Sequence, residues 1–201
     1  MPGTLEFIFD FGGPNAYLAY RALPGLLART GAALHYTPCL LGGIFRATNN
    51  RPPLVRYAEI PAKLAYEQLE MERFVKAHGL HSFRINPNFP MNTLMLMRAA
   101  IVAEDMGLLD RFIESAMTAM WEVGENMADP DVIARVLDAD GFDARTMLAR
   151  TEDQAVKEKL IANTEHAVAR GAFGVPTFFV AGEMFFGKDR LAQVEAALAL
   201  A

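Results

Sequence analysis

The sequence predicts an α/β fold whose strands come from the two ends of the chain, with helices between them. Residues 5–13 place phenylalanine at every second position before ending in Gly-Gly, and this alternation is typical of a strand. Pro14 suits the first turn of a helix, which we predict to run to Arg29. A second strand is predicted over residues 34–41, so the chain begins with a strand–helix–strand unit.

The C-terminal part of the sequence predicts a hairpin followed by a helix. Residues 177–180 and 183–186 are apolar strand candidates separated by an Ala-Gly turn, and a helix is predicted over residues 189–199. Pro176 is placed just before the first of these strands, because proline has no N–H to donate inside a sheet. A βαβ unit joined to a ββα unit across a proline turn makes a thioredoxin-like fold.

The sequence between these two parts predicts only helices. Asp129 is the expected N-cap of a helix that starts at Pro130, and Thr151 with Gln154 has the spacing of a capping box. The other predicted helices cover residues 60–78, 93–106, 108–123, 143–149 and 151–170. The predicted domains are a thioredoxin-like domain, residues 1–45 with 171–201, and an all-helical insertion, residues 46–170.

The composition indicates a compact protein and disfavours several classes of partner. The chain has 201 residues, 52% of them hydrophobic, which is enough for one domain with a large core. Its net charge of −5 argues against nucleic acid and anionic membranes as partners. No apolar stretch reaches the roughly 20 residues of a membrane span and no secretory leader is evident, so we expect a cytoplasmic protein. The histidines show no metal-ligand spacing, so we predict no metal site.

Six short motifs resemble one enzyme family in the same order along the chain. They are Phe-Asp-Phe-Gly-Gly-Pro-Asn-Ala-Tyr-Leu-Ala (9–19), Leu-Gly-Gly-Ile-Phe-Arg-Ala-Thr-Asn-Asn (41–50), Pro-Ala-Lys-Leu-Ala-Tyr (61–66), Phe-Pro-Met-Asn-Thr (89–93), Phe-Gly-Val-Pro-Thr (173–177) and Phe-Gly-Lys-Asp-Arg (186–190). Together they resemble the 2-hydroxychromene-2-carboxylate isomerases and kappa-class glutathione transferases, a DsbA-like branch of the thioredoxin superfamily. The resemblance implies a DsbA-like fold, glutathione as the cofactor and a homodimer.

The turn before the first C-terminal strand is the predicted site for the peptide backbone of the cofactor. At the start of a strand, Pro176 leaves neighbouring backbone groups free, so Val175 offers its N–H and C=O to an extended peptide. The resemblance implies that Asp189 binds the α-amino group of the γ-glutamyl residue, while it also starts a helix as an N-cap. Arg190 is a nearby cation that either binds the cofactor or lies on a solvated surface.

The resemblance assigns two more residues, Asn50 and Lys63, and two others, Tyr66 and Asn92, are candidates for contacting the substrate. Asn50 and Lys63 match residues that reach the ligand across the cleft, and Lys63 would hold a carboxylate unless it is a solvated helix lysine. Tyr66 lies one turn beyond Lys63 and either contacts an aromatic substrate or packs in the core. Asn92 either binds substrate or caps a helix.

The predicted catalytic groups, Gly13 and Asn15, lie at the start of the first helix. Free N–H groups and the helix dipole stabilise a thiolate there. The family usually has a serine where this chain has Gly13, so we expect backbone N–H groups of residues 13–16, with the Asn15 amide, to replace its hydroxyl. The alternative is that Gly12-Gly13 is only a flexible turn. Residues 13–16 lack a Cys-x-x-Cys motif, which argues against a disulfide oxidoreductase, and the single cysteine, Cys39, is predicted to be buried and inert.

These assignments predict a glutathione-dependent cis-trans isomerase of aromatic catabolism. Its substrate would be a small aromatic carboxylate, 2-hydroxychromene-2-carboxylate or a close analogue, converted to trans-o-hydroxybenzylidenepyruvate. A thiolate that adds to the enone of such a molecule turns a double bond into a single bond, which rotates. Two alternatives are a kappa-like glutathione transferase, which conjugates an electrophile, and a glutathione-binding protein without activity.

Overall fold

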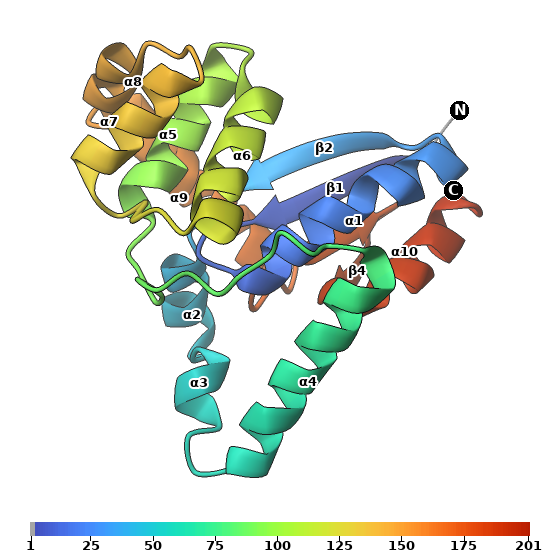
Figure 1. Cartoon of the computed structure of the whole chain (residues 1–201). Helices are drawn as coiled ribbons and strands as arrows, with labels where there is room; N and C mark the ends of the chain where they lie inside the picture. Colours follow the sequence, from blue (N-terminus) through green and yellow to red (C-terminus); the bar gives the residue numbers. More distant parts are fainter. Residues whose placement is uncertain (1–2) are drawn as a thin grey trace.

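A four-stranded mixed sheet, built from both ends of the chain, is the centre of the molecule (Figure 1). The computed structural model describes residues 3–201. The strands are β1 (Thr4–Phe9), β2 (Ala33–Pro38), β3 (Thr177–Val180) and β4 (Glu183–Phe186), in the spatial order β2-β1-β3-β4. β1 is parallel to β2 and antiparallel to β3, and β4 is antiparallel to β3. This arrangement confirms the predicted thioredoxin-like fold.

The second strand is shorter than predicted, because a buried carboxylate ends it. β2 stops at Pro38, and the N–H of Cys39 still donates to the carbonyl of Phe9 at 3.0 Å. The next free donor, the N–H of Leu41, bonds the carboxylate of Asp10 at 2.7 Å instead of a strand. The chain then turns into α2 (Leu41–Thr48), so the predicted strand over 34–41 was wrong at its C-terminal end.

The two faces of the sheet are covered by different helices. The first and last helices, α1 (Pro14–Thr30) and α10 (Leu191–Leu198), pack together on one face, where Phe7 stacks on Phe178 with ring centroids 5.3 Å apart. On the other face the carboxylate of Glu6 pairs with Arg170, which directly follows α9. Successive side chains of a strand point to opposite faces, so α1 and α9 lie on opposite sides of the sheet.

All elements between β2 and β3 are helices, as predicted. They are α2, α3 (Pro53–Arg56), α4 (Pro61–His78), α5 (Leu94–Asp105), α6 (Leu109–Thr118), a π-helical turn (Ala119–Val123), α7 (Pro130–Ala139), α8 (Ala144–Arg150) and α9 (Gln154–Ala169). Figure 1 shows α5 to α8 grouped beyond one end of the sheet, whereas α3 and α4 project away from it. The division into domains at residues 45 and 170 stays a prediction. None of the helices in residues 3–201 is long and apolar enough to cross a membrane.

The helix ends test the capping predictions. Asp129 caps α7 as predicted, since its carboxylate accepts the N–H of Asp131. The capping box at Thr151 was wrong: its hydroxyl donates to the carbonyl of Leu148 at 2.7 Å, which closes α8. Helix α9 begins three residues later, at Gln154. Two short helices, α2 and α3, were not predicted.

Candidate functional site

The start of α1 and the turn before β3 meet at a tight contact between Gly13 and Val175. A Cβ atom placed on Gly13 would lie 3.0 Å from Cγ2 of Val175 and 3.5 Å from the Cβ of Ala16. The backbone of Gly13 has φ −98° and ψ 107°, which any residue adopts, so the backbone conformation does not require a glycine here. A side chain at residue 13 would press on Val175, which would have to move by a few tenths of an ångström to make room for it.

Only one backbone N–H at the start of α1 is free to bind a ligand. The N–H of Gly13 donates to the carbonyl of Asp10 at 3.2 Å, and Pro14 has none to donate. The N–H groups of Ala16 and Tyr17 both donate to the carbonyl of Gly13. Among residues 3–201 the N–H of Asn15 has no acceptor. The predicted set of donors over 13–16 is thus narrowed to Asn15.

The side chain of Asn15 also has an unused polar atom. Its Oδ1 is buried and accepts no hydrogen bond from the described part of the chain. Buried polar atoms are almost always paired in folded proteins, so an unpaired one at the start of a helix is consistent with a ligand site. The backbone N–H, the Oδ1 atom and the positive end of the helix dipole all belong to this first turn.

Asp10 holds the turn that leads into this site. It is fully buried, and its Oδ1 accepts the N–H of Gly12 at 2.8 Å and the hydroxyl of Thr93 at 2.7 Å. Its Oδ2 accepts the N–H of Leu41. Burial raises the pKa of Asp10, and the three donors oppose that rise. The sequence reasoning missed this residue, although a carboxylate between two phenylalanines was a usable signal.

Trp121 supports the same turn from the insertion. Its indole N–H donates to the carbonyl of Phe11 at 2.8 Å, and the ring is fully buried. Trp121 lies in the π-helical turn that follows α6, and the side-chain amide of Asn86 donates to the carbonyls of Met120 and Glu125 beside it. The π-helical turn therefore carries a contact from the helical insertion to the start of α1.

The turn before β3 leaves the backbone of Val175 unpaired. Neither its N–H nor its C=O has a hydrogen-bond partner within residues 3–201. The groups around it are used: the hydroxyl of Thr177 donates to the carbonyl of Gly174 at 2.8 Å, and the carbonyl of Pro176 accepts the N–H of Gly187 at 2.9 Å. The Val175–Pro176 bond is cis. These free groups match what the sequence predicted for an extended peptide ligand.

Asn50 supports this turn with the amide that was predicted to reach the ligand. Its Nδ2 donates to the carbonyl of Phe173 at 2.9 Å. Its Oδ1 accepts the N–H of Arg51 at 2.9 Å and the guanidinium of Arg56 at 3.0 Å. Both ends of the amide are occupied within the chain, so Asn50 connects the end of α2 to the loop that carries Val175.

Asp189 lies in a short 3₁₀ turn (Lys188–Arg190) and does not cap a helix. Its carboxylate accepts a hydrogen bond from the ammonium of Lys188 at 2.8 Å, and no backbone N–H bonds it. The predicted N-cap role is wrong because α10 starts only at Leu191. The Asp189 side chain is 57% exposed, whereas that of Lys188 is 5% exposed and its Nζ lies 5.2 Å from the Phe74 ring. Arg190 is exposed.

Lys63 and Tyr66 lie in residues 51–70, a segment that we call the arm and in which no residue is buried. They do not lie in a closed cleft. Lys63 is exposed, and its Nζ lies 3.9 Å from the ring centroid of Tyr57. Tyr66 is 56% exposed, which rules out the alternative that it packs in the core. Glu70 and, more weakly, Asp189 raise the pKa of Tyr66, so its hydroxyl lies within electrostatic reach of Asp189.

Asn92 starts a helix and also lines a cavity. Its Oδ1 accepts the N–H of Leu94 at 2.9 Å, which supports the capping alternative. The cavity has a volume of about 230 Å³ and is also lined by Leu94, Met95, Arg98 and Ala128. Asn92 precedes Thr93, whose methyl group lies 3.2 Å from where a Cβ on Gly12 would be. One residue that lines the cavity is therefore the neighbour in sequence of a residue that contacts the turn at the start of α1.

Cys39 does not belong to this site. Its thiol is buried and donates to the carbonyl of Asn163 at 3.4 Å. Burial raises the pKa of the thiol, and the nearby carboxylates of Asp10 and Glu6 raise it further. The thiol form is therefore favoured, as expected for an inert cysteine.

This fold and this site define a thioredoxin-like protein without redox cysteines. The model of the DSBA-like thioredoxin domain matches residues 4–199, so the chain belongs to that family. It is 28% identical over 200 residues to a 2-hydroxychromene-2-carboxylate isomerase of Sphingobium xenophagum, covering 98% of this chain and 99% of that protein. It is 25% identical over 209 residues to glutathione S-transferase kappa 1 of Homo sapiens, covering 95% and 88%.

A solved structure of 2-hydroxychromene-2-carboxylate isomerase has the same fold. The TM-score is 0.84 at 25% sequence identity, over 98% of this chain and 95% of that one. The resemblance stated from the motifs is therefore confirmed over almost the full length. The family includes both isomerases and transferases among these relatives, so the reaction itself has to be argued from the site.

Proposed function

We propose that this protein binds glutathione and acts as a cis-trans isomerase of a small aromatic carboxylate related to 2-hydroxychromene-2-carboxylate. The observation that carries the proposal is the junction of α1 with the turn before β3. There the side chain of Val175, whose backbone N–H and C=O are unpaired within residues 3–201, contacts Gly13, which lies two residues before Asn15 and its unpaired N–H. An extended peptide that carries a thiol side chain fits this pair of features, because the free groups of Val175 bind peptide backbone and the start of α1 stabilises negative charge.

The remaining residues fit the two ends of a tripeptide. The exposed carboxylate of Asp189 is suited to the α-amino group of the γ-glutamyl residue, since Lys188 uses only one of its oxygens. The cations Arg190 and Lys63 are suited to the carboxylates of the cofactor. Pro176 and Asn50 keep the Val175 turn in place, Asn50 through its bond to Phe173.

Stabilisation of the thiolate depends more on Asn15 in this chain than in family members that have a serine at the position of Gly13. Gly13 offers no hydroxyl, and a side chain at this position would press on Val175. The N–H of Asn15 and the dipole of a 17-residue helix then supply the stabilisation of negative charge. When bound, glutathione would supply the thiol nucleophile for the isomerisation, and the N–H of Asn15 would stabilise its thiolate form. Tyr66 and the cavity beside Asn92 are the proposed contacts for the aromatic substrate.

The direct test follows the absorbance of 2-hydroxychromene-2-carboxylate as it converts to its trans-benzylidenepyruvate isomer, with and without glutathione. We expect conversion that requires the enzyme and catalytic amounts of glutathione, with no loss of free thiol. Glutathione binding is measured separately by calorimetry. Conversion that proceeds equally well without glutathione would overturn the cofactor assignment, and binding without conversion would overturn the isomerase assignment.

A kappa-like transferase is the second candidate, because a kappa-class relative matches 95% of the chain. A transferase consumes thiol as it conjugates an electrophile, whereas an isomerase returns it. An aryl halide offered with glutathione distinguishes the two, since only the transferase consumes thiol in proportion to product. A glutathione-binding protein without activity is the third candidate, and it would show neither reaction. The homodimer and the cytoplasmic location stay predictions.

A further inference from the structure

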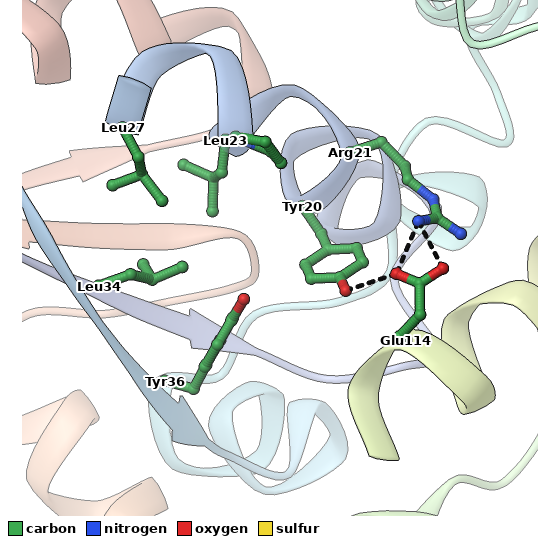
Figure 2. Close-up of a pocket in the computed structure, with 8 residues that line it drawn as sticks. Tyr20, Arg21, Leu23, Leu27, Leu34, Tyr36 and Glu114 are labelled. Carbon is green, nitrogen blue, oxygen red and sulfur yellow. Dashed lines mark hydrogen bonds and ion pairs between the residues drawn. The ribbon is translucent and has the colours of Figure 1, made fainter. Parts of the chain in front are cut away.

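A second cavity lies along the later turns of α1 and is separate from the candidate site at the start of that helix. It has a volume of about 170 Å³ and lies between α1, β2 and α6 (Figure 2). Its lining residues are Tyr20, Arg21, Leu23, Pro24, Leu27, Leu34, Tyr36 and Glu114. The first α1 residue that lines it, Tyr20, lies about two turns beyond Gly13, and none of its walls comes from the Val175 turn. We call it the α1–β2 cavity.

The walls of the α1–β2 cavity are mostly apolar and fit one aromatic ring. Leu23 and Leu27 of α1 face Leu34 and Tyr36 of β2 (Figure 2). The ring of Tyr36 is fixed from behind by Phe7 and Phe9, with centroids 6.1 and 6.0 Å away. The cavity is open on one side, since Pro24 is exposed and Leu27, Leu34 and Tyr36 are half-buried. Its volume is close to the roughly 150 Å³ in which an enclosed apolar cavity accepts benzene, so it has room for a single ring.

One end of the cavity is polar and held rigidly. The carboxylate of Glu114 accepts the hydroxyl of Tyr20 at 2.8 Å and the guanidinium of Arg21 at 2.7 and 2.8 Å. Burial raises the pKa of Tyr20, and its bond to Glu114 raises it further, so this phenol stays neutral. Arg21 also bonds Glu122 and Thr118. This network fixes the side chains that a ligand would meet.

Two hydrogen-bonding groups in the walls have no regular partner. The hydroxyl of Tyr36 bonds no other group in residues 3–201 and is reached by solvent, and Figure 2 shows it directed into the space between Leu23 and Tyr20. Pro24 lies inside α1 and has no N–H, so the carbonyl of Tyr20 lacks its i+4 donor. A ligand that donates one hydrogen bond would use the hydroxyl of Tyr36.

The charges around the cavity disfavour an anion. Glu114 and Glu122 outnumber Arg21 at the polar end, and Asp110 lies close enough to act on Tyr36. Burial first, and then Asp110 and Glu114, raise the pKa of Tyr36 to about 12, so its hydroxyl stays protonated and both donates and accepts. A carboxylate or phenolate would be repelled, whereas a neutral hydroxyl would be accepted.

We propose that the α1–β2 cavity is a second binding site, for one neutral single-ring phenol, separate from the proposed glutathione site. The ring lies between the leucines of α1 and β2, and the phenol hydroxyl bonds the hydroxyl of Tyr36. The apolar walls supply most of the affinity, and Tyr36 distinguishes a phenol from a hydrocarbon of the same shape. The carboxylate that lines the cavity, that of Glu114, is bonded to Tyr20 and Arg21, so the site binds the phenol without reacting with it.

The test compares phenol, toluene and benzoate by calorimetry and by chemical-shift titration of the whole protein. We expect saturable 1:1 binding of phenol, weaker binding of toluene and none of benzoate. Tyr36→Phe should weaken phenol binding by roughly twofold to tenfold, the range of one hydrogen bond, and leave toluene unchanged. Tyr57→Phe, which removes a hydroxyl on the arm, is the matched control and should change neither.

A second pair of variants tests the place of binding. Leu34→Phe fills the cavity and should abolish binding of both phenol and toluene, while Leu54→Phe makes the same change on an exposed side chain and should not. Circular dichroism checks that each variant folds, and Leu27→Phe replaces Leu34→Phe if that one does not. Phenol binding that persists in the filled variant, that is equal for toluene, or that saturating glutathione displaces would overturn the proposal.

Discussion

The junction of Gly13 with Val175 and the arm formed by residues 51–70 both carry residues that the resemblance assigns to glutathione, yet they are built in opposite ways. At the junction a side chain on Gly13 would come within 3.0 Å of Val175, and only a few polar groups are left unpaired. On the arm no residue is buried, and Leu54, Val55 and Ile60 are each more than half exposed.

This difference shows which part of the site the chain fixes by itself. Phe74 is the one buried residue of α4, and it lies beyond the arm towards the end of that helix. A helix gains most of its stability from packing an apolar face, and α4 has little of that. The position of Val175 is therefore set by the fold, whereas the positions of Lys63 and Tyr66 depend on what packs against the arm. The following predictions separate the two regions.

Asp10→Ala should have the largest effect, because it removes the acceptor for three donors behind the junction. The N–H groups of Gly12 and Leu41 and the hydroxyl of Thr93 would all lose their partner. We expect a loss in the free energy of unfolding on the order of 3 kcal/mol or more, measured by urea denaturation. Glu165→Ala, an exposed acid on α9, is the control and should be neutral. A neutral Asp10→Ala would show that the junction is not held as described.

Gly13→Ser tests whether space or chemistry decides the residue at the junction. The new side chain would press on Val175, so we expect a loss of about 1–3 kcal/mol in stability and weaker glutathione binding. Adding Val175→Ala should recover stability and binding together, because it removes the methyl group in contact. Thermal unfolding and calorimetry on the single and double variants give the answer. If Gly13→Ser alone binds glutathione more tightly, the steric argument is wrong.

Asn15→Asp should act on the thiolate and leave the fold intact. A carboxylate near the start of a helix interacts favourably with the positive end of the helix dipole, so the free energy of unfolding should be unchanged or slightly higher. The same negative charge should raise the pKa of the bound glutathione thiol by about 1, because it opposes the thiolate. The measurement is the thiolate absorbance of the complex against pH. Asn15→Ala keeps the backbone N–H and should change this pKa less. If Asn15→Ala changes the pKa as much as Asn15→Asp does, the backbone N–H of Asn15 does not have its proposed role.

Lys63→Ala should have the smallest effect on the fold, since the side chain is exposed and makes no ion pair within residues 3–201. We expect unchanged thermal stability and a loss in glutathione affinity of roughly twofold to fivefold, typical of one exposed ion pair. Lys76→Ala, a lysine near the other end of α4, provides the comparison. Equal affinities for wild type and Lys63→Ala would confine the glutathione site to the junction.

Local sequence patterns predicted much of the fold because they depend on near neighbours. Alternating phenylalanines predicted β1, an aspartate before a proline predicted the start of α7, and a proline before an apolar run predicted the start of β3. The same reasoning failed at Thr151, where two residue types with the right spacing matched a capping box. Thr151 instead closes the preceding helix, which local spacing does not reveal.

The sequence by itself determined the order of the strands and of the longer helices, the family and the turn at Val175, because periodicity, proline and short motifs record those features directly. The tertiary structure decided which groups at the candidate site are free. Whether Gly13 has room for a side chain depends on Val175, and which N–H at the start of α1 stays unpaired depends on how the turn after β1 folds back on Asp10. Such facts arise from contacts between distant segments, and no local pattern in the chain encodes them.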